Sequence, residues 1–101
     1  MILHTVNKSP FEKNSLDTCF RLAKEGSTIL LIEDAVYAAP KGTAIKEKIS
    51  AATARYRIFA LSPDLKARGL SEAGLVDGIK LVDYAGFVDL VSEHDSVQAW
   101  L

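Results

Sequence analysis

The feature that most constrains this sequence is the alternation of short apolar runs with helical patterns along its 101 residues. The run over residues 28–32 is uninterrupted and rich in β-branched side chains, as expected of a strand covered on both faces. Similar runs predict four more strands, which gives the set 2–6, 28–32, 57–61, 79–82 and 97–101. Because helical patterns separate the strands, we expect an α/β fold. We expect a single domain, residues 1–101, with a mostly parallel five-stranded sheet flanked by helices on both faces.

Residues that can cap helices precede the helical patterns. We expect helices at about 16–25, 63–68 and 84–93, and one after Thr43 whose apolar residues 45, 49, 52 and 56 recur at helical spacing. A short turn is expected at 35–37. The expected N-caps are Ser15, Asp34, Thr43, Ser62 and Asp83.

Composition excludes several classes of protein. Twelve basic and thirteen acidic residues give a net charge of −1, which argues against a chain that binds nucleic acid directly through phosphate contacts. No apolar run approaches the ~20 residues that a membrane-spanning helix needs, and the first residues do not resemble a signal peptide. The single cysteine indicates a reducing compartment. We therefore expect a cytoplasmic protein without a membrane partner.

Polar residues gather where the expected strands end. The carboxyl ends of parallel strands form the functional edge of such a sheet, so these residues are expected to share one rim. They could form a catalytic carboxylate cluster or a magnesium site, but helix capping accounts better for Asp34, Ser62 and Asp83. The rim comprises Asn7, Ser9, Glu33, Asp34, Ser62, Asp64, Asp83 and Tyr84.

Neither a metal site nor a cofactor site is predicted. His4 and His94 are far apart in the sequence and have no second histidine or cysteine at ligand spacing. Neither of the glycine-rich phosphate-binding motifs is present. We expect His4 to make one hydrogen bond at the core or rim, and His94 to suit the negative end of the last helix.

Cys19 is the one residue with nucleophilic potential. It lies near the start of the first expected helix, where the helix dipole modestly favours a thiolate. It also lies mid-way along an apolar arc formed with Leu16, Phe20 and Ala23, and no cationic residue shares its face. This favours a buried, small apolar residue over a reactive thiol, although the second interpretation stays open.

Trp100 and Tyr84 are candidate interface residues. A tryptophan next to the end of the chain either pins the last strand to the core or contacts a partner, since aromatic side chains are enriched at interface hot spots. Tyr84 follows a predicted strand, where a partner could cover it. The sequence leaves both interpretations of Trp100 open.

The sequence resembles the DsrH/TusB family of sulfur-relay proteins over nearly its whole length. The segment Asp64-Leu65-Lys66-Ala67-Arg68-Gly69 matches a motif typical of that family, and the remaining similarity is spread in order along the chain. The similar segments are 2–11, 30–39, 63–70, 82–90 and 98–100.

The resemblance implies a three-layer α/β/α subunit similar to DsrE and DsrF, or to TusD and TusC. It implies that the chain assembles with such subunits in a heterohexamer, which passes persulfide sulfur to a carrier of the DsrC/TusE type. It also implies that the indispensable cysteine is on the DsrE/TusD subunit, which leaves Cys19 as a candidate accessory persulfide thiol at most.

Two branches of the family fit the sequence. A cysteine in the first helix is more typical of DsrH, so we expect a role in cytoplasmic sulfur oxidation. The alternatives are a TusB-like role in 2-thiolation of the tRNA wobble uridine, and a non-catalytic structural subunit of either complex.

Overall fold

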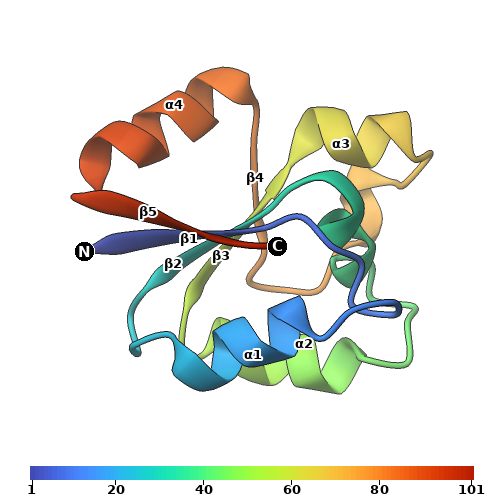
Figure 1. The fold of residues 1–101 in the computed structure, drawn as a ribbon. Coiled ribbons are helices and arrows are strands. Elements are labelled where there is room, and N and C mark those ends of the chain that lie inside the picture. The colour runs from blue at the N-terminus through green and yellow to red at the C-terminus, as the bar shows by residue number, and fades with distance from the viewer.

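The computed structural model, which describes residues 1–101, contains one five-stranded sheet (Figure 1). The strands are β1 (Ile2–Val6), β2 (Thr28–Leu31), β3 (Arg57–Leu61), β4 (Lys80–Val82) and β5 (Ser96–Trp100). Their order in the sheet is β4-β3-β2-β1-β5, and every neighbouring pair is parallel. The predicted α/β class and five-stranded sheet are therefore confirmed, and the sheet is parallel throughout.

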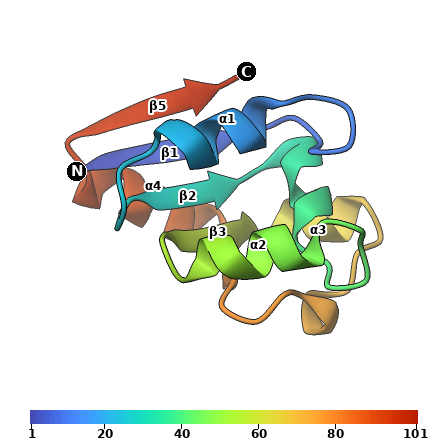
Figure 2. The same cartoon turned by 90° about the horizontal axis from the view of Figure 1, so that it is seen from below.

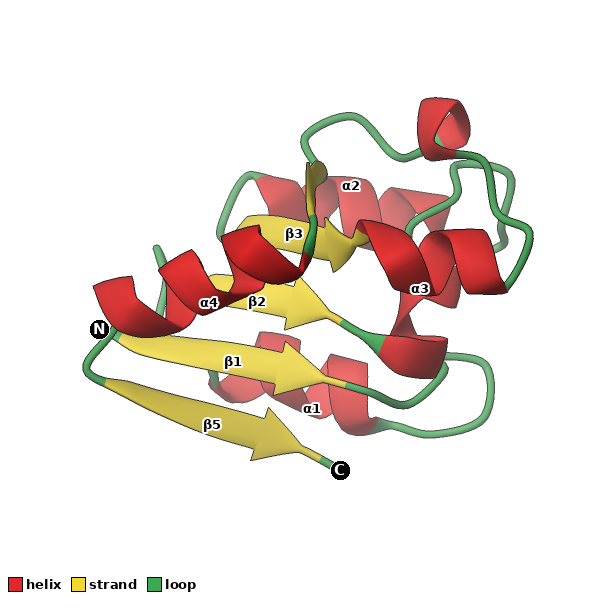
Figure 3. Cartoon of the chain, turned by 90° about the horizontal axis from the view of Figure 1, so that it is seen from above, coloured by secondary structure: helices red, strands yellow, loops and turns green.

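Helices cover both faces of the sheet. Helices α1 (Ser15–Leu22) and α2 (Lys46–Thr53) lie side by side on one face (Figure 2). Helix α4 (Tyr84–Glu93) crosses the opposite face, and α3 (Ser62–Ala67) lies on the same side near the carboxyl ends of the strands (Figures 1 and 3). The chain passes through α4 from β4 at one edge of the sheet to β5 at the other. Two 3-10 helices, η1 (Glu33–Ala38) and η2 (Glu72–Gly74), complete the fold.

The two faces of the sheet differ in how much apolar surface they bury. The larger cluster contains 19 buried residues, among them Ile29, Ile58 and Ile49 on the side of α1 and α2, and it extends to Leu65 of α3. The cluster beneath α4 contains only Leu3, Leu30, Phe59 and Leu90. The α4 face is therefore the thinly covered side of this domain.

Strand positions match the sequence expectations more closely than helix starts do. The second strand ends at Leu31, and the first helix ends at Leu22, where residue 25 was expected. Ser15 is not the N-cap of α1, because Asn14 precedes the helix and the Ser15 hydroxyl donates to the carbonyl of Leu101. The helix expected after Thr43 begins only at Lys46, since Thr43 instead accepts from the Ile45 amide in a local turn.

None of the helices is both long and apolar enough to span a membrane.

Candidate functional site

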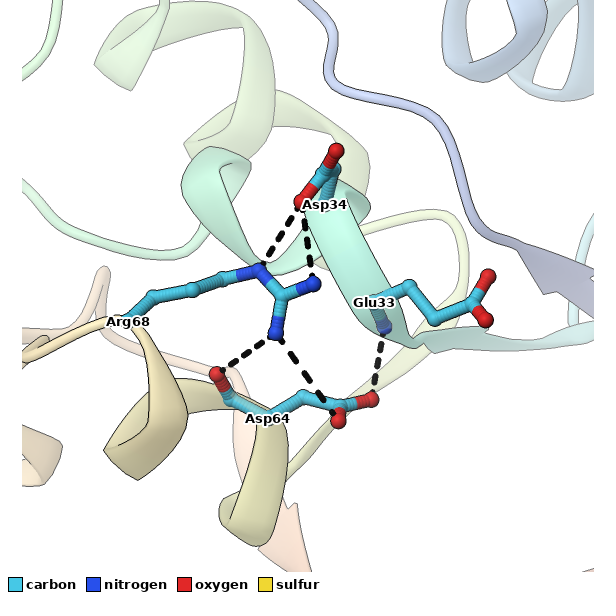
Figure 4. A network of polar contacts seen from close by, with 4 residues as sticks. All are labelled: Glu33, Asp34, Asp64 and Arg68. Atoms are coloured by element: carbon cyan, nitrogen blue, oxygen red, sulfur yellow. Dashed lines mark hydrogen bonds and ion pairs between the residues drawn. The ribbon is translucent and has the colours of Figure 1, made fainter.

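The ends of β2 and β3 are joined by a network of charged side chains around Arg68 (Figure 4). The Arg68 guanidinium donates through Nε to Asp34 Oδ1 at 2.9 Å, and its second terminal nitrogen lies 2.9 Å from the same oxygen. Its other terminal nitrogen donates to the carbonyl of Asp64 at 3.2 Å. The network thus ties η1, which follows β2, to α3, which follows β3.

Asp64 also holds a strained backbone position in this network. Glu33 is the one non-glycine residue with a positive φ, at 50°. Its amide donates to Asp64 Oδ2 at 2.6 Å, while its own carboxylate points away from Arg68 (Figure 4). A left-handed conformation costs a non-glycine residue about 1–2 kcal/mol, and a charge-assisted hydrogen bond of this kind offsets that cost.

Two carboxylates of the rim are thus engaged with a neighbouring segment: Asp34 pairs with Arg68 at the end of α3, and Asp64 accepts from Glu33 in η1. The structure contains no group of three or more His, Cys, Asp and Glu side chains placed to hold a metal ion. The network resembles a structural clamp at the point where the chain leaves adjacent strands for opposite sides of the sheet.

Of the three rim residues expected to be helix caps, only Asp83 is one. Its carboxylate accepts from the Gly86 amide at 2.8 Å at the start of α4. Ser62 lies inside the first turn of α3 and donates to Glu72 Oε1, so the prediction that it caps this helix is wrong. The prediction that Asp34 is a cap is also wrong, because its carboxylate accepts from the Arg68 guanidinium instead. In each case a side chain from a distant segment competes with local capping.

Asn7 and Ser9 occupy the end of β1. The Ser9 hydroxyl accepts from the Phe11 amide, which closes a tight turn. Asn7 places its Oδ1 in the interior without a hydrogen-bond partner. Neither side chain joins the Arg68 network, so the structure divides the expected rim into separate parts.

Cys19 is fully buried, as its place on the apolar arc of α1 predicts. It belongs to the larger core cluster together with Leu16, Phe20 and Ala23. Burial raises the pKa of the Cys19 thiol to about 12. Because a thiolate is the nucleophilic form, the folded chain presents Cys19 as a protonated core residue.

His4 and Trp100 form a pair that links β1 to β5. The Trp100 indole donates from Nε1 to His4 Nδ1 at 3.0 Å, and the Trp100 ring packs against the larger core cluster. Burial lowers the pKa of His4 below its usual 6.5, which keeps the imidazole neutral and able to accept this bond. The structure thus supports the interpretation in which Trp100 pins the last strand.

His94 and Tyr84 lie at opposite ends of α4. The His94 ring contacts the Leu90 carbonyl through Nδ1 and the Thr28 hydroxyl through Nε2, so it joins the helix end to β2. Tyr84 is 60% exposed. Of the two candidate interface residues, Tyr84 is therefore the one that this chain leaves uncovered.

Sequence reasoning missed the central role of Arg68. A lone arginine at the end of a short helix gave no signal of its own, because its partner Asp34 lies 34 positions away in the sequence. The hydrogen bond between His4 and Trp100 joins residues 96 positions apart, so the sequence could not predict it either. Only the position of Arg68 within the motif at residues 64–69 could have singled it out.

Comparison with known proteins identifies the family. A family model described as "DsrH like protein" matches residues 8–97. The chain belongs to the DsrH-like family. Curated relatives named "Protein TusB" include those of Pectobacterium parmentieri and Escherichia coli K12, at 36% and 38% identity. Each alignment covers 98% of this chain and 100% of the relative.

Solved structures support the same fold for this DsrH-like protein. The ychN protein from E. coli superimposes with a TM-score of 0.85 at 22% identity, covering 97% of each chain. The protein MTH1491 of Methanobacterium thermoautotrophicum gives a TM-score of 0.68 at 16% identity, covering 97% of this chain and 96% of its own. At these identities the likeness concerns the fold alone.

Proposed function

We propose that this protein is the TusB-like subunit of a cytoplasmic sulfur-relay complex that supplies sulfur for 2-thiolation of the tRNA wobble uridine. The observation that carries the proposal is the full-length similarity to proteins named TusB at 36–39% identity. This reverses the branch that Cys19 favoured at the level of sequence. A cysteine buried in the core is explained by packing, so its presence is weak evidence for the sulfur-oxidation branch.

In this proposal the chain has a structural role and docks partner proteins, and the thiol that carries the sulfur lies on a partner subunit. Cys19 is the only cysteine, and its buried thiol has a pKa of about 12. The partners implied by the family resemblance are TusC- and TusD-like subunits in a heterohexamer, with the indispensable cysteine on the TusD-like chain. An accessory persulfide on Cys19 is the competing hypothesis, and it requires α1 to open from the sheet.

The chemistry proposed for the complex needs no cofactor. The thiolate of a TusE-like carrier attacks the outer sulfur of a persulfide on the partner, and a new S–S bond forms. The old S–S bond breaks, and the partner cysteine leaves as a thiolate. One sulfur atom has moved and the overall oxidation level is unchanged.

Deletion of the gene in its own host tests the function. We expect the 2-thiouridine content of tRNA, measured by nucleoside mass spectrometry, to fall sharply and to return when the gene is restored. Unchanged 2-thiouridine together with impaired oxidation of reduced sulfur compounds would overturn the proposal and restore the DsrH branch.

Intact mass of the assembled complex tests where the sulfur resides. After loading with a persulfide donor, the TusD-like subunit should gain ~32 Da, the mass of one sulfur atom, while this chain stays unchanged. A gain on this chain that disappears in Cys19→Ala would establish the accessory thiol instead.

A further inference from the structure

Helix α4 exposes more apolar surface than a helix on a free domain should. Its sequence is apolar on nearly every side, yet Leu90 is its only buried residue. Tyr84 and Val88 are 60% and 66% exposed, and Val91 is exposed as well. These three residues follow the spacing i, i+4, i+7, so they form one stripe along the helix. A helix that is apolar on most sides is normally buried on most sides.

The stripe lies beside the uncovered face of β5. Leu90 faces the sheet, and α4 runs opposite to the strands (Figure 3), so the right-handed turn of the helix places the stripe on the flank toward β5. Val97 pairs in register with Leu3, which lies in the cluster beneath α4, so Val97 points to the same side of the sheet. Val97 is 47% exposed. We call Tyr84, Val88, Val91 and Val97 the α4–β5 surface.

β5 is also an edge strand without protection. It is the last strand in the sheet order and pairs only with β1. The segment Ser96–Trp100 contains no proline and no charged residue, which are the usual devices that keep an edge from pairing or packing.

The segment that carries this surface is acidic. Residues 81–101 hold four acidic residues and none of the twelve lysines and arginines. All four are exposed. The N-terminal ammonium of Met1 pairs with Asp95, which leaves Asp83, Asp89 and Glu93 outside any salt bridge. An apolar stripe on an acidic segment complements a partner whose own apolar patch is bordered by lysine and arginine.

We propose that the α4–β5 surface docks another protein subunit of the relay complex, through an apolar patch with a basic rim. This inference rests on the proposed function and adds the side of the chain that the partner covers. A second copy of this chain is a poorer occupant, because a symmetric contact through this surface would bring acidic segments together. Nucleic acid is excluded by the same acidic charge.

Reconstitution with purified TusC- and TusD-like subunits of the same organism tests the proposal. Val88→Glu and Tyr84→Ala change exposed side chains, and Leu22→Glu on α1 is the matched control, since Leu22 is 63% exposed on the other face. We expect Val88→Glu to weaken assembly at least ~30-fold, as for a hot-spot residue, and Leu22→Glu to assemble like the wild type. Asp89→Lys should slow association and reduce its dependence on salt.

Circular dichroism of each isolated variant shows whether it folds, and hydrogen exchange of the wild type gives a second readout. The partners should protect the amides of α4 and β5. Normal assembly of Val88→Glu and Tyr84→Ala, or protection confined to α1 and α2, would overturn the docking surface while leaving the proposed function intact. A wild-type chain that does not assemble with either subunit, or that assembles only with itself, would overturn both.

Discussion

At the scale of single residues, the side chains with the greatest chemical reactivity are not the accessible ones. Cys19 has the only thiol, but it is fully buried in the larger core cluster. His4 is also buried, and its Nδ1 is committed to the Trp100 indole. Both side chains are held in their neutral forms by burial, so each makes stability depend on pH in a direction that can be stated.

Cys19 should resist alkylation in the folded chain and destabilise it at high pH. The unfolded thiol ionises near pH 9, whereas the folded one ionises near 12. Its contribution to stability is therefore complete below pH 9 and is lost as the pH rises from 9 toward 12. Iodoacetamide labelling should be slow until denaturant is added, and urea unfolding should show a steeper alkaline loss in wild type than in Cys19→Ala.

Substitution of Cys19 gives the complementary result. Cys19→Ser places a hydroxyl without an identified partner in the core and should cost about 1–3 kcal/mol of unfolding free energy. Cys19→Ala leaves a small cavity and should cost ~1 kcal/mol. Sulfur transfer by the assembled complex should persist in both variants. Complete loss of transfer in an intact Cys19→Ala complex would contradict the packing role.

The pair of His4 and Trp100 should make the attachment of β5 sensitive to acid. Because the folded pKa of His4 lies below 6.5, the unfolded state takes up a proton first as the pH falls. The stabilisation is complete above pH 6.5 and is lost below it. Trp100 is the only tryptophan, so its fluorescence during urea unfolding at pH 7.5 and 5.5 reports on this contact. His4→Gln should remove most of the difference, and an equal acid loss in that variant would contradict the assignment.

At the scale of elements, the sequence predicted strands better than helix boundaries, and the reason is physical. Buried parallel strands need continuous apolar runs, which can be recognised locally in the sequence, as at residues 58–61 of β3. A polar side chain caps a helix only if it bonds the local helix amides, and groups from distant segments compete for the same side chain. Asp34 bonds to Arg68, and Ser62 bonds to Glu72. Asp83 has no such competing partner and caps α4 as predicted.

The clamp between η1 and α3 should depend on Asp64 more than on Asp34. Asp64 accepts from the left-handed Glu33 amide and its side chain is 17% exposed, while that of Asp34 is 56% exposed. Asp64→Ala should lower the unfolding free energy by about 1.5–3 kcal/mol, and Asp34→Ala by ~1 kcal/mol or less. Chemical denaturation measures both. Equal losses would show that the Arg68 ion pairs, and not the Glu33 amide, determine the strength of the clamp.

At the scale of the whole molecule, the predicted sheet is correct, but the predicted single rim of polar residues is divided into separate parts. Alternation along the chain predicts a parallel sheet, yet it does not give the strand order, which sets β5 beside β1 and sends α4 across one face. The uneven cover of the two faces follows from that order. Tyr84 could be named from its position after a strand, but the stripe that it shares with Val88 and Val91 becomes meaningful only once α4 is seen beside β5.

That uneven cover predicts a chain that gains stability from its partners. A subunit that binds only the folded form stabilises it by RT ln(1 + [L]/Kd), or ~2.7 kcal/mol when its free concentration is one hundred times Kd. For a domain of this size each kcal/mol raises Tm by about 4–8 °C, so saturating partner should raise Tm by roughly 10–20 °C. Differential scanning calorimetry of this chain, alone and with purified TusC- and TusD-like subunits, measures the shift. Val88→Glu should melt like the wild type alone but show little shift with partner. An unchanged wild-type Tm would mean that the isolated chain is already the complete folding unit.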